Sequence, residues 1–187
     1  MVKILTTILF FIFITFNHNI FADSVLFVGD SVMAGLPKKY LRDKLNNQFI
    51  VEYETKECRK LTSIGCFHNS PESALTILSK KNADTIVIML GHNDNRNKSF
   101  RSKVKILLNK MSNTKHVYWL TMREVSKSYQ NANAILKEEI ATYKNAQLID
   151  WAEFSRNEPT WFVRDGTHLK PIGARNMADF IVRILLL

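Results

Sequence analysis

Three short motifs contain the residue types needed for acyl transfer through a serine. Residues 29–31 read Gly-Asp-Ser, residues 91–93 read Gly-His-Asn, and residues 165–168 read Asp-Gly-Thr-His. A serine hydroxyl is a weak nucleophile until a histidine takes its proton, and that histidine needs an acidic partner to hold its tautomer. One member of this set lies in the first motif and the other two lie in the third.

Each motif can be given a separate role. We interpret Ser31 as the nucleophile, His168 as the general base and Asp165 as the carboxylate that orients the histidine, because two intervening residues let both side chains face the same way in one loop. The oxygen that becomes negative during attack needs hydrogen-bond donors. The backbone amide of Ser31, at a strand-to-helix turn, and the side-chain amide of Asn93 can supply them. Gly91 permits the tight turn that would aim Asn93.

The elements around these motifs alternate between strand and helix. Apolar and β-branched runs predict strands at residues 24–28, 49–53, 84–90, 115–121 and 147–150. Apolar residues at spacings of three and four predict helices at residues 36–45, 71–81, 99–111, 131–143 and 171–187. Such alternation predicts an α/β fold in one domain, a five-stranded, mostly parallel sheet with helices on both faces.

Position distinguishes these motifs from chance matches. A Gly-Asp-Ser triplet or an Asp-x-x-His pair is often only a turn or a helix cap. Here all three motifs follow predicted strands or lie in the loop before the last helix. Because the carboxyl ends of parallel strands meet at one edge of a sheet, we expect one site there.

Residues 1–22 have the pattern of a secretory signal peptide. Lys3 is followed by an apolar run at 4–16, and a short polar stretch ends on Ala22. Cleavage after Ala22 would leave residues 23–187 as a secreted or periplasmic domain with no stable membrane insertion. The alternative is a retained membrane anchor, although the run is shorter than the roughly 20 residues of a bilayer span.

The chain has two cysteines, Cys58 and Cys66, in a stretch at 54–69 that is predicted to be irregular. In an oxidising compartment they can form a disulfide, and two free thiols are the alternative. Two cysteines with only His68 nearby do not make a zinc site, so we expect no metal and no cofactor.

The formal charge of +9, from 26 basic and 17 acidic residues, suggests an anionic partner. The basic residues are scattered and are not interleaved with aromatic residues as a base-stacking surface requires. We therefore expect no nucleic-acid partner. An anionic envelope polymer and simple solvation of helix faces are the two remaining explanations.

The three motifs resemble the conserved blocks of the SGNH or GDSL hydrolases, with residues 29–31, 91–94 and 165–168 matching the Gly-Asp-Ser, Gly-x-Asn-Asp and Asp-x-x-His blocks. The resemblance spans nearly all of residues 23–187. It implies a flavodoxin-like, three-layer α/β/α fold, a serine esterase or acyl-transfer mechanism, no metal, and an oxyanion hole formed by the Ser31 amide and Asn93.

Further details resemble the extracytoplasmic SGNH domains attached to membrane O-acyltransferases, which modify or deacylate cell-wall sugars. The similar residues are Val32, Met33, Cys58, Arg59, Cys66 and 165–169. The family also has a separate glycine block that completes the oxyanion hole. Gly65 is the nearest candidate for it, and an arginine such as Arg59 is the alternative.

Several other residues could contact a substrate. Those assigned to substrate binding are Arg59, His92 and Trp161. His92 could form the pocket wall or act as a second base, while Asp94 is expected to brace its loop. Trp161 could stack on a sugar or pack the last helix against the sheet. Arg123 and Glu124 could face the active edge or form a structural ion pair.

The leading hypothesis is a monomeric, secreted serine esterase that hydrolyses acyl esters, above all acetyl esters, of carbohydrates or small molecules. One alternative is an O-acyltransferase acting on cell-envelope polysaccharide, because the same acyl-enzyme serves both reactions. A second alternative is a carbohydrate-binding envelope protein without catalytic activity.

Overall fold

The computed structural model describes residues 22–66, 70–94 and 98–187. Nearly all of the predicted signal peptide, and His68, lie outside the described residues. Over those three ranges, no helix combines the length and the apolar character needed to cross a membrane.

The described chain alternates between strands and helices, as expected. The strands are β1 (Asp23–Gly29), β2 (Phe49–Thr55), β3 (Thr85–Met89), β4 (His116–Leu120) and β5 (Ala146–Ile149). The helices are α1 (Ser31–Ala34), α2 (Lys38–Leu45), α3 (Ala74–Lys80), α4 (Phe100–Lys110), α5 (Lys127–Ile140), α6 (Trp151–Phe154) and α7 (Pro171–Leu185), with a 3₁₀ turn η1 (Pro159–Trp161).

The five strands form one sheet in the order β2-β1-β3-β4-β5, and every neighbouring pair is parallel. This is the flavodoxin-like order, so the predicted three-layer α/β/α fold is confirmed. The chain leaves β1 toward one side of the sheet for β2 and returns to the other side for β3. Ligands of such sheets bind at this switch point, outside the carboxyl ends of the strands.

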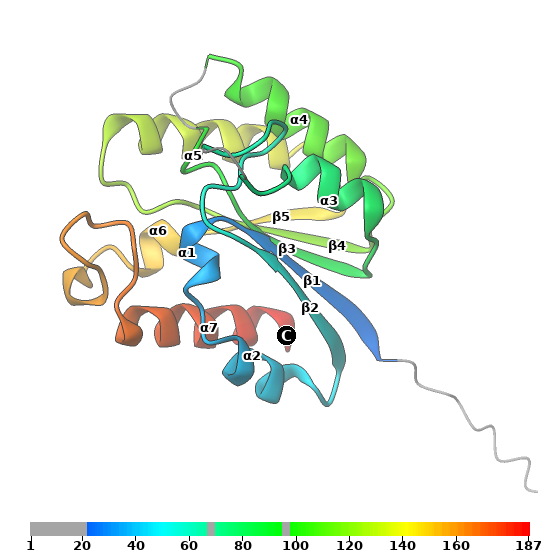
Figure 1. The fold of residues 1–187 in the computed structure, drawn as a ribbon, viewed down its shortest axis with the longest axis horizontal. Helices are drawn as coiled ribbons and strands as arrows, with labels where there is room; N and C mark the ends of the chain where they lie inside the picture. The colour runs from blue at the N-terminus through cyan, green and yellow to red at the C-terminus, as the bar shows by residue number, and fades with distance from the viewer. Residues whose placement is uncertain (1–21, 67–69, 95–97) are drawn as a thin grey trace, which may run out of the picture.

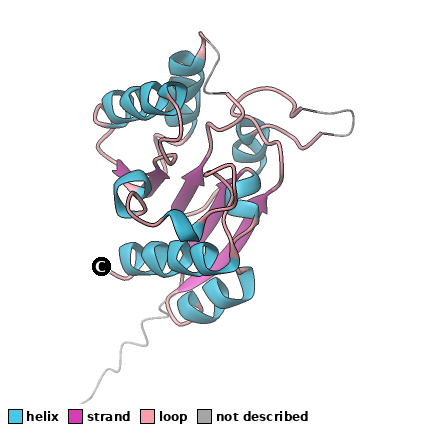
Figure 2. Cartoon of the chain, turned by 90° about the vertical axis from the view of Figure 1, so that its left-hand side faces the viewer, coloured by secondary structure: helices cyan, strands magenta, loops and turns pink. Residues whose placement is uncertain are grey.

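Helices cover both faces of the sheet. Helices α3, α4 and α5 lie on one face, and α2 and α7 lie together on the other (Figure 1). Figure 2 shows the strands between these two helical layers. Alternate side chains of β1 enter the two cores: Val25 and Phe27 pack with α2 and α7, whereas Leu26 and Val28 pack with α3, α4 and α5. Each is fully buried, which stabilises the fold by about 1.5–3 kcal/mol per side chain.

Some helix boundaries differ from the predicted ones. Helix α3 begins at Ala74 and is capped by Ser73, whose Oγ accepts the Thr76 amide at 3.1 Å. Residues 71–73, which were predicted to be helical, therefore precede α3. Helix α5 begins at Lys127, four residues before the predicted start. Helix α6 and the η1 turn were not predicted, because segments of four and three residues are too short to show a helical period.

Asp84 ties the start of β1 to the start of β3. Its Oδ2 accepts the Ser24 amide at 2.8 Å and the Ser24 hydroxyl at 2.6 Å. These hydrogen bonds, with Lys115 nearby, hold the pKa of Asp84 below its ordinary value of 3.8. A carboxyl whose pKa is lowered by folding stabilises the fold above its ordinary pKa, and this contribution is lost as the pH falls through the lowered value.

We therefore expect Asp84→Asn to lower the melting temperature at pH 7, and the difference from the unmodified protein to shrink as the pH falls below 3.8. Thermal unfolding followed by circular dichroism across this pH range measures it. Asp43→Asn, on the exposed surface of α2, is the matched control. A difference that stays constant with pH would contradict the assignment.

Candidate active site

Ser31 lies at the turn from β1 into α1. A Cβ atom at Gly29 would lie 2.3 Å from the Cβ of Met33, so only glycine lets α1 pack this closely against the end of the strand. Asp30 caps the helix by accepting the Val32 amide at 3.1 Å. Ser31 is the first helical residue, and its amide donates to no other residue that the structure describes. That amide therefore remains available to an anionic oxygen.

Asp165 and His168 lie in a closed loop between η1 and α7. An antiparallel bridge joins Phe162 to Leu169 at its base. Inside it, the Val163 amide donates to the His168 carbonyl at 2.9 Å. These bonds make the loop a compact hairpin with a fixed backbone.

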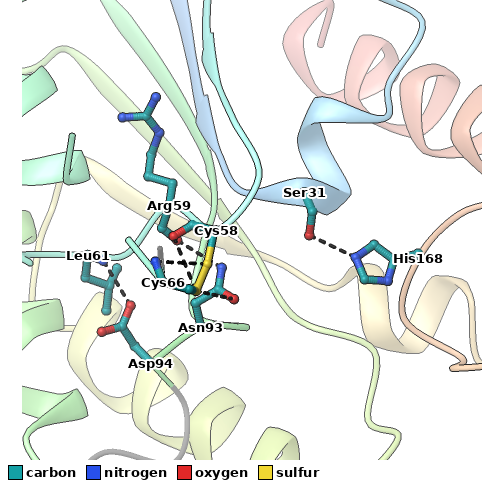
Figure 3. The surroundings of a disulfide bond; sticks show 8 residues. All are labelled: Ser31, Cys58, Arg59, Leu61, Cys66, Asn93, Asp94 and His168. Atoms are coloured by element: carbon teal, nitrogen blue, oxygen red, sulfur yellow. Dashed lines mark hydrogen bonds between the residues drawn. A yellow bond between two sulfur atoms is a disulfide. The ribbon is translucent and has the colours of Figure 1, made fainter. Parts of the chain in front are cut away.

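A chain of hydrogen bonds connects the predicted nucleophile, base and carboxylate. Ser31 Oγ lies 2.9 Å from His168 Nε2, and His168 Nδ1 lies 2.7 Å from Asp165 Oδ2. Figure 3 shows the serine and the imidazole facing each other. An ionised carboxylate can only accept, so the proton must be on Nδ1, and Nε2 is then free to accept the Ser31 hydroxyl.

The carboxylate of Asp165 is held in its charged form. Burial by itself would raise its pKa, but hydrogen bonds from the His168 ring and from the amides of Thr167 and His168, at 2.8 and 2.9 Å, outweigh it. The net effect lowers the pKa of Asp165 from its ordinary 3.8. The side chains of Asp165 and His168 are each 49% exposed, so the pair is open to a substrate from solvent.

The turn after β3 carries Asn93. It starts at Gly91, whose φ of +129° is in the left-handed region and whose added Cβ would lie 2.9 Å from the Met122 side chain. Both facts favour glycine. The next side chain, His92, is buried and bonded to Asp30, so the structure does not expose it as a pocket wall.

The Cys58–Cys66 disulfide is present in the structure, with the two Cα atoms 5.6 Å apart. It closes a ring that lies against Asn93 (Figure 3). Asn93 Nδ2 donates to the Arg59 carbonyl at 3.1 Å, and Asn93 Oδ1 lies 4.0 Å from the Cys66 sulfur. Because a disulfide sulfur carries no proton, the second contact is van der Waals. The ring therefore orients the Asn93 amide, leaving one of its two N–H groups for another acceptor.

Asp94 braces the same turn, as expected. Its Oδ2 accepts the Leu61 amide at 2.9 Å, and its Oδ1 accepts from Lys103 at 2.6 Å. The side chain is almost completely buried. Asp94 thus ties the Asn93 turn to the disulfide ring and to α4.

Replacing both Cys58 and Cys66 by serine is expected to lower the free energy of unfolding by about 2–3 kcal/mol, because the short ring no longer restricts the unfolded chain. Urea denaturation measures this change. The unmodified protein in excess reductant should unfold at the same urea concentration as the double variant. Equal stability of the oxidised protein and the double variant would contradict the prediction.

Arg59 is placed away from the proposed reacting atoms. Its side chain is 4% exposed, and its guanidinium donates to the Glu72 carbonyl at 2.6 Å and lies 3.8 Å from the Glu54 carboxylate. Burial lowers the pKa of Arg59 below its ordinary value, although Glu54 and Glu72 oppose this. Figure 3 shows the guanidinium pointing away from Ser31 and His168. This placement fits a structural role in the loop, whereas substrate contact was expected.

Gly65 is also engaged elsewhere. Its amide donates to the Pro71 carbonyl at 3.4 Å, and an added Cβ would lie 2.6 Å from the Cys58 carbonyl. Glycine is needed here for close backbone packing, and the amide is not free for an oxyanion. The Ser31 amide and the Asn93 side chain remain the available donors among the predicted ones.

Trp161 belongs to an aromatic cluster beside α7. Its ring lies 6.0 Å from that of Trp151 and 5.9 Å from that of Phe154, centroid to centroid. A Cβ at Gly173 of α7 would lie 2.2 Å from the Trp161 carbonyl. The packing alternative therefore describes Trp161 better than stacking on a sugar does.

Arg123 and Glu124 are not paired with each other in the described part of the chain. Arg123 donates to the Gly166 carbonyl at 3.0 Å and stacks 4.1 Å above the Phe162 ring, whereas Glu124 accepts from Asn133. Arg123 thus braces the loop of Asp165 and His168. This role was not predicted from the sequence. The place of Arg123 after β4 indicated only that it lay near the active edge.

A polar cleft of about 210 Å³ adjoins this brace. Its lining residues are Arg123, Glu124, Val125, Asp150, Ala152, Glu153 and Arg156. Most are charged, and all follow β4 or β5. The cleft is therefore at the same sheet edge as Ser31.

A family profile described as "Protein of unknown function (DUF459)" matches residues 24–183. The chain belongs to this family. Because the match covers β1 through most of α7, all three motifs of this DUF459 protein lie inside the shared region.

One curated relative is a putative peptidoglycan O-acetyltransferase, YrhL, of Bacillus subtilis (strain 168). It is 27% identical over 167 residues, which cover 88% of this DUF459 chain and 24% of YrhL. The chain thus corresponds to about a quarter of the length of that relative.

Solved structures show the same fold. The C-terminal catalytic domain of peptidoglycan O-acetyltransferase A (OatA) of Streptococcus pneumoniae gives a TM-score of 0.69 at 18% identity, covering 88% of this chain and 93% of that one. A lipolytic G-D-S-L protein of Veillonella parvula gives 0.65 at 15% identity, covering 86% and 97%. A carbohydrate acetylesterase family member from Sinorhizobium meliloti gives 0.65 at 17% identity, covering 87% and 97%. The resemblance of the DUF459 chain to SGNH hydrolases is confirmed.

Proposed function

We propose that this protein is an extracytoplasmic serine esterase that removes acyl groups, above all acetyl groups, from carbohydrate esters. The observation that carries the proposal is the hydrogen-bonded series from Ser31 through His168 to Asp165. It has the donor and acceptor directions that serine activation requires.

In the proposed mechanism, His168 Nε2 takes the Ser31 proton as Oγ attacks the ester carbonyl carbon. The carbonyl oxygen becomes negative and accepts hydrogen bonds from the Ser31 amide and Asn93 Nδ2. His168 then donates its proton to the leaving alcohol, which leaves an acyl group on Ser31. Water, deprotonated by His168, hydrolyses this ester and restores the hydroxyl.

Two observations support a carbohydrate substrate outside the cytoplasm. The cleft beside the Asp165 loop is open and lined mostly by charged side chains, which suits a polyhydroxylated molecule better than a lipid. The disulfide and the apolar run at 4–16 support export, with residues 1–22 as a signal peptide and 23–187 as the exported domain.

Transfer of the acyl group to a sugar hydroxyl is the second candidate. Its support is the likeness to YrhL, named as a putative peptidoglycan O-acetyltransferase, and to the catalytic domain of the peptidoglycan O-acetyltransferase OatA. The two reactions share every step up to the acyl-enzyme. They differ in whether water or an alcohol attacks it.

Hydrolysis of 4-nitrophenyl acetate tests the esterase proposal, and we expect saturable release of 4-nitrophenol. Adding an N-acetylglucosamine oligomer and measuring products by mass spectrometry then separates the two candidates. Free acetate as the main product supports hydrolysis, whereas acetylated oligomer as the main product supports transfer. No turnover on this ester or on acetylated glycans would overturn both.

Asn93→Ala is expected to lower kcat for 4-nitrophenyl acetate by about 10²–10³-fold with little change in KM, because its amide acts mainly on the oxyanion. Asn176→Ala is the matched control, since the Nδ2 of that side chain donates to the Ile172 carbonyl on the exposed surface of α7. Equal kcat values for the Asn93 variant and the control would remove Asn93 from the oxyanion hole.

A further inference from the structure

Asp30 and His92 form a second aspartate–histidine pair, next to the turn that carries Ser31, and the pair has no part in the mechanism above. His92 Nδ1 donates to Asp30 Oδ2 at 2.8 Å, and the two side chains are 7% and 0% exposed. The other oxygen of Asp30 accepts the Val32 amide. Both carboxylate oxygens are thus engaged away from water, so the contact has one defined geometry.

The position of the pair relates it to both halves of the proposed site. Asp30 immediately precedes Ser31, and His92 immediately precedes Asn93. The two turns follow β1 and β3, which are neighbouring strands in register, and the Asp30 amide donates to the Met89 carbonyl at 3.3 Å. The pair therefore joins the turn of the nucleophile to the turn of the oxyanion donor.

Other contacts of the Asn93 turn lead elsewhere. Asn93 and Asp94 bond to the disulfide ring, and Asp94 also bonds to α4. Within residues 22–66, 70–94 and 98–187, His92 supplies the one side-chain hydrogen bond between this turn and the nucleophile turn. Without this hydrogen bond, the side-chain contacts of the Asn93 turn would be mainly those with the disulfide ring and α4.

We propose that Asp30 and His92 are positioning residues that fix the spacing between Ser31 Oγ and the Asn93 amide. The inference rests on the proposed esterase function. In the tetrahedral intermediate the reacting carbon is bonded to Ser31 Oγ while its oxyanion must reach Asn93 Nδ2. A misplacement of about 1 Å between such groups can cost about 10²-fold in rate. Neither Asp30 nor His92 touches the substrate.

Two amide variants, each of which matches the position of one imidazole nitrogen, separate a positioning role of His92 from a role in packing alone. In His92→Asn the side-chain amide takes the place of Nδ1, so it can still donate to Asp30. In His92→Gln the amide extends to the place of Nε2, so the bond to Asp30 is lost. We expect His92→Gln to lower kcat by about 10²-fold with KM little changed, and His92→Asn to recover most of that loss.

Hydrogen exchange provides a second readout that does not depend on turnover. The Val32 amide is held by Asp30 Oδ1, so it should exchange faster in His92→Gln than in His92→Asn or the unmodified protein. Melting temperatures of all three proteins show whether the Gln variant is folded. If the Gln variant is not folded, His92→Asn is compared with the unmodified protein: similar kcat and similar Val32 exchange support the link, and a large difference in either contradicts it.

The outcomes separate the two proposals. An active unmodified protein with equal kcat values in both His92 variants overturns the positioning role. Equal exchange at Val32 in all three folded proteins overturns the link between the turns, whatever the turnover. An unmodified protein that hydrolyses no ester overturns the esterase proposal instead, and exchange then decides the link alone.

Discussion

Replacement of Ser31 by alanine is expected to reduce kcat for ester hydrolysis by about 10⁴-fold or more, as removal of a serine nucleophile does in other hydrolases. In the proposed mechanism the hydroxyl oxygen bonds to the substrate carbon, and nothing else in the Ser31–His168–Asp165 series can replace it. The activity that remains would come from substrate binding and the oxyanion donors. Steady-state kinetics with 4-nitrophenyl acetate measure the loss.

A fluorophosphonate provides a direct control, because it labels only an activated serine. The unmodified protein should be labelled and Ser31→Ala should not. Ser79→Ala, which removes an exposed hydroxyl from α3, should keep both labelling and turnover. Turnover by Ser31→Ala at the rate of the Ser79 variant would overturn the esterase proposal.

Asp165→Asn is expected to lower kcat by about 10⁴-fold while leaving the fold intact. The carboxylate accepts from His168 Nδ1, which places the ring proton there. An asparagine amide at the same place donates to Nδ1, so the proton moves to Nε2. Nε2 can then no longer accept the proton of Ser31, 2.9 Å away.

The matched control for this variant is Asp43→Asn, which removes a carboxylate paired with Lys39 on the exposed surface of α2. It should leave kcat unchanged. A crystal structure of Asp165→Asn should show the Ser31 and His168 side chains in place. A kcat for Asp165→Asn within about tenfold of the unmodified value would show that another group orients the histidine.

The fold was predictable from the sequence because its central strand is strongly apolar and predicted strands alternate with predicted helices. Every residue of β3 (Thr85–Met89) is buried. Segments that contain helices separate β3 along the chain from its neighbours in the sheet, β1 and β4. The same reasoning predicted that Ser31, Asn93 and Asp165 lie at one edge of the sheet, since each follows a predicted strand or precedes the last helix. This part of the prediction depended on apolar periodicity and on the alternation of strands and helices.

Side-chain partners were less predictable, because they depend on segments far apart in the sequence. Asp30 and His92 are 62 positions apart, and neither residue indicates the other by spacing. Arg59 was expected at the substrate, but its buried side chain bonds to the Glu72 carbonyl and lies near the Glu54 carboxylate. Arg123 reaches a carbonyl 43 positions away. Such contacts follow from the tertiary fold rather than from a local pattern.

The distance along the chain between Ser31 and His168 has a consequence for biosynthesis. The two residues are separated by 137 positions, so the first strand of the sheet is made long before the loop that carries the base. Contacts between residues so far apart in the sequence form only after most of the domain has been synthesised. A chain that stops before residue 168 would present a serine with no base to activate it. The proposed esterase activity would therefore require nearly complete synthesis of the domain, and translation products that end before residue 168 are expected to lack it.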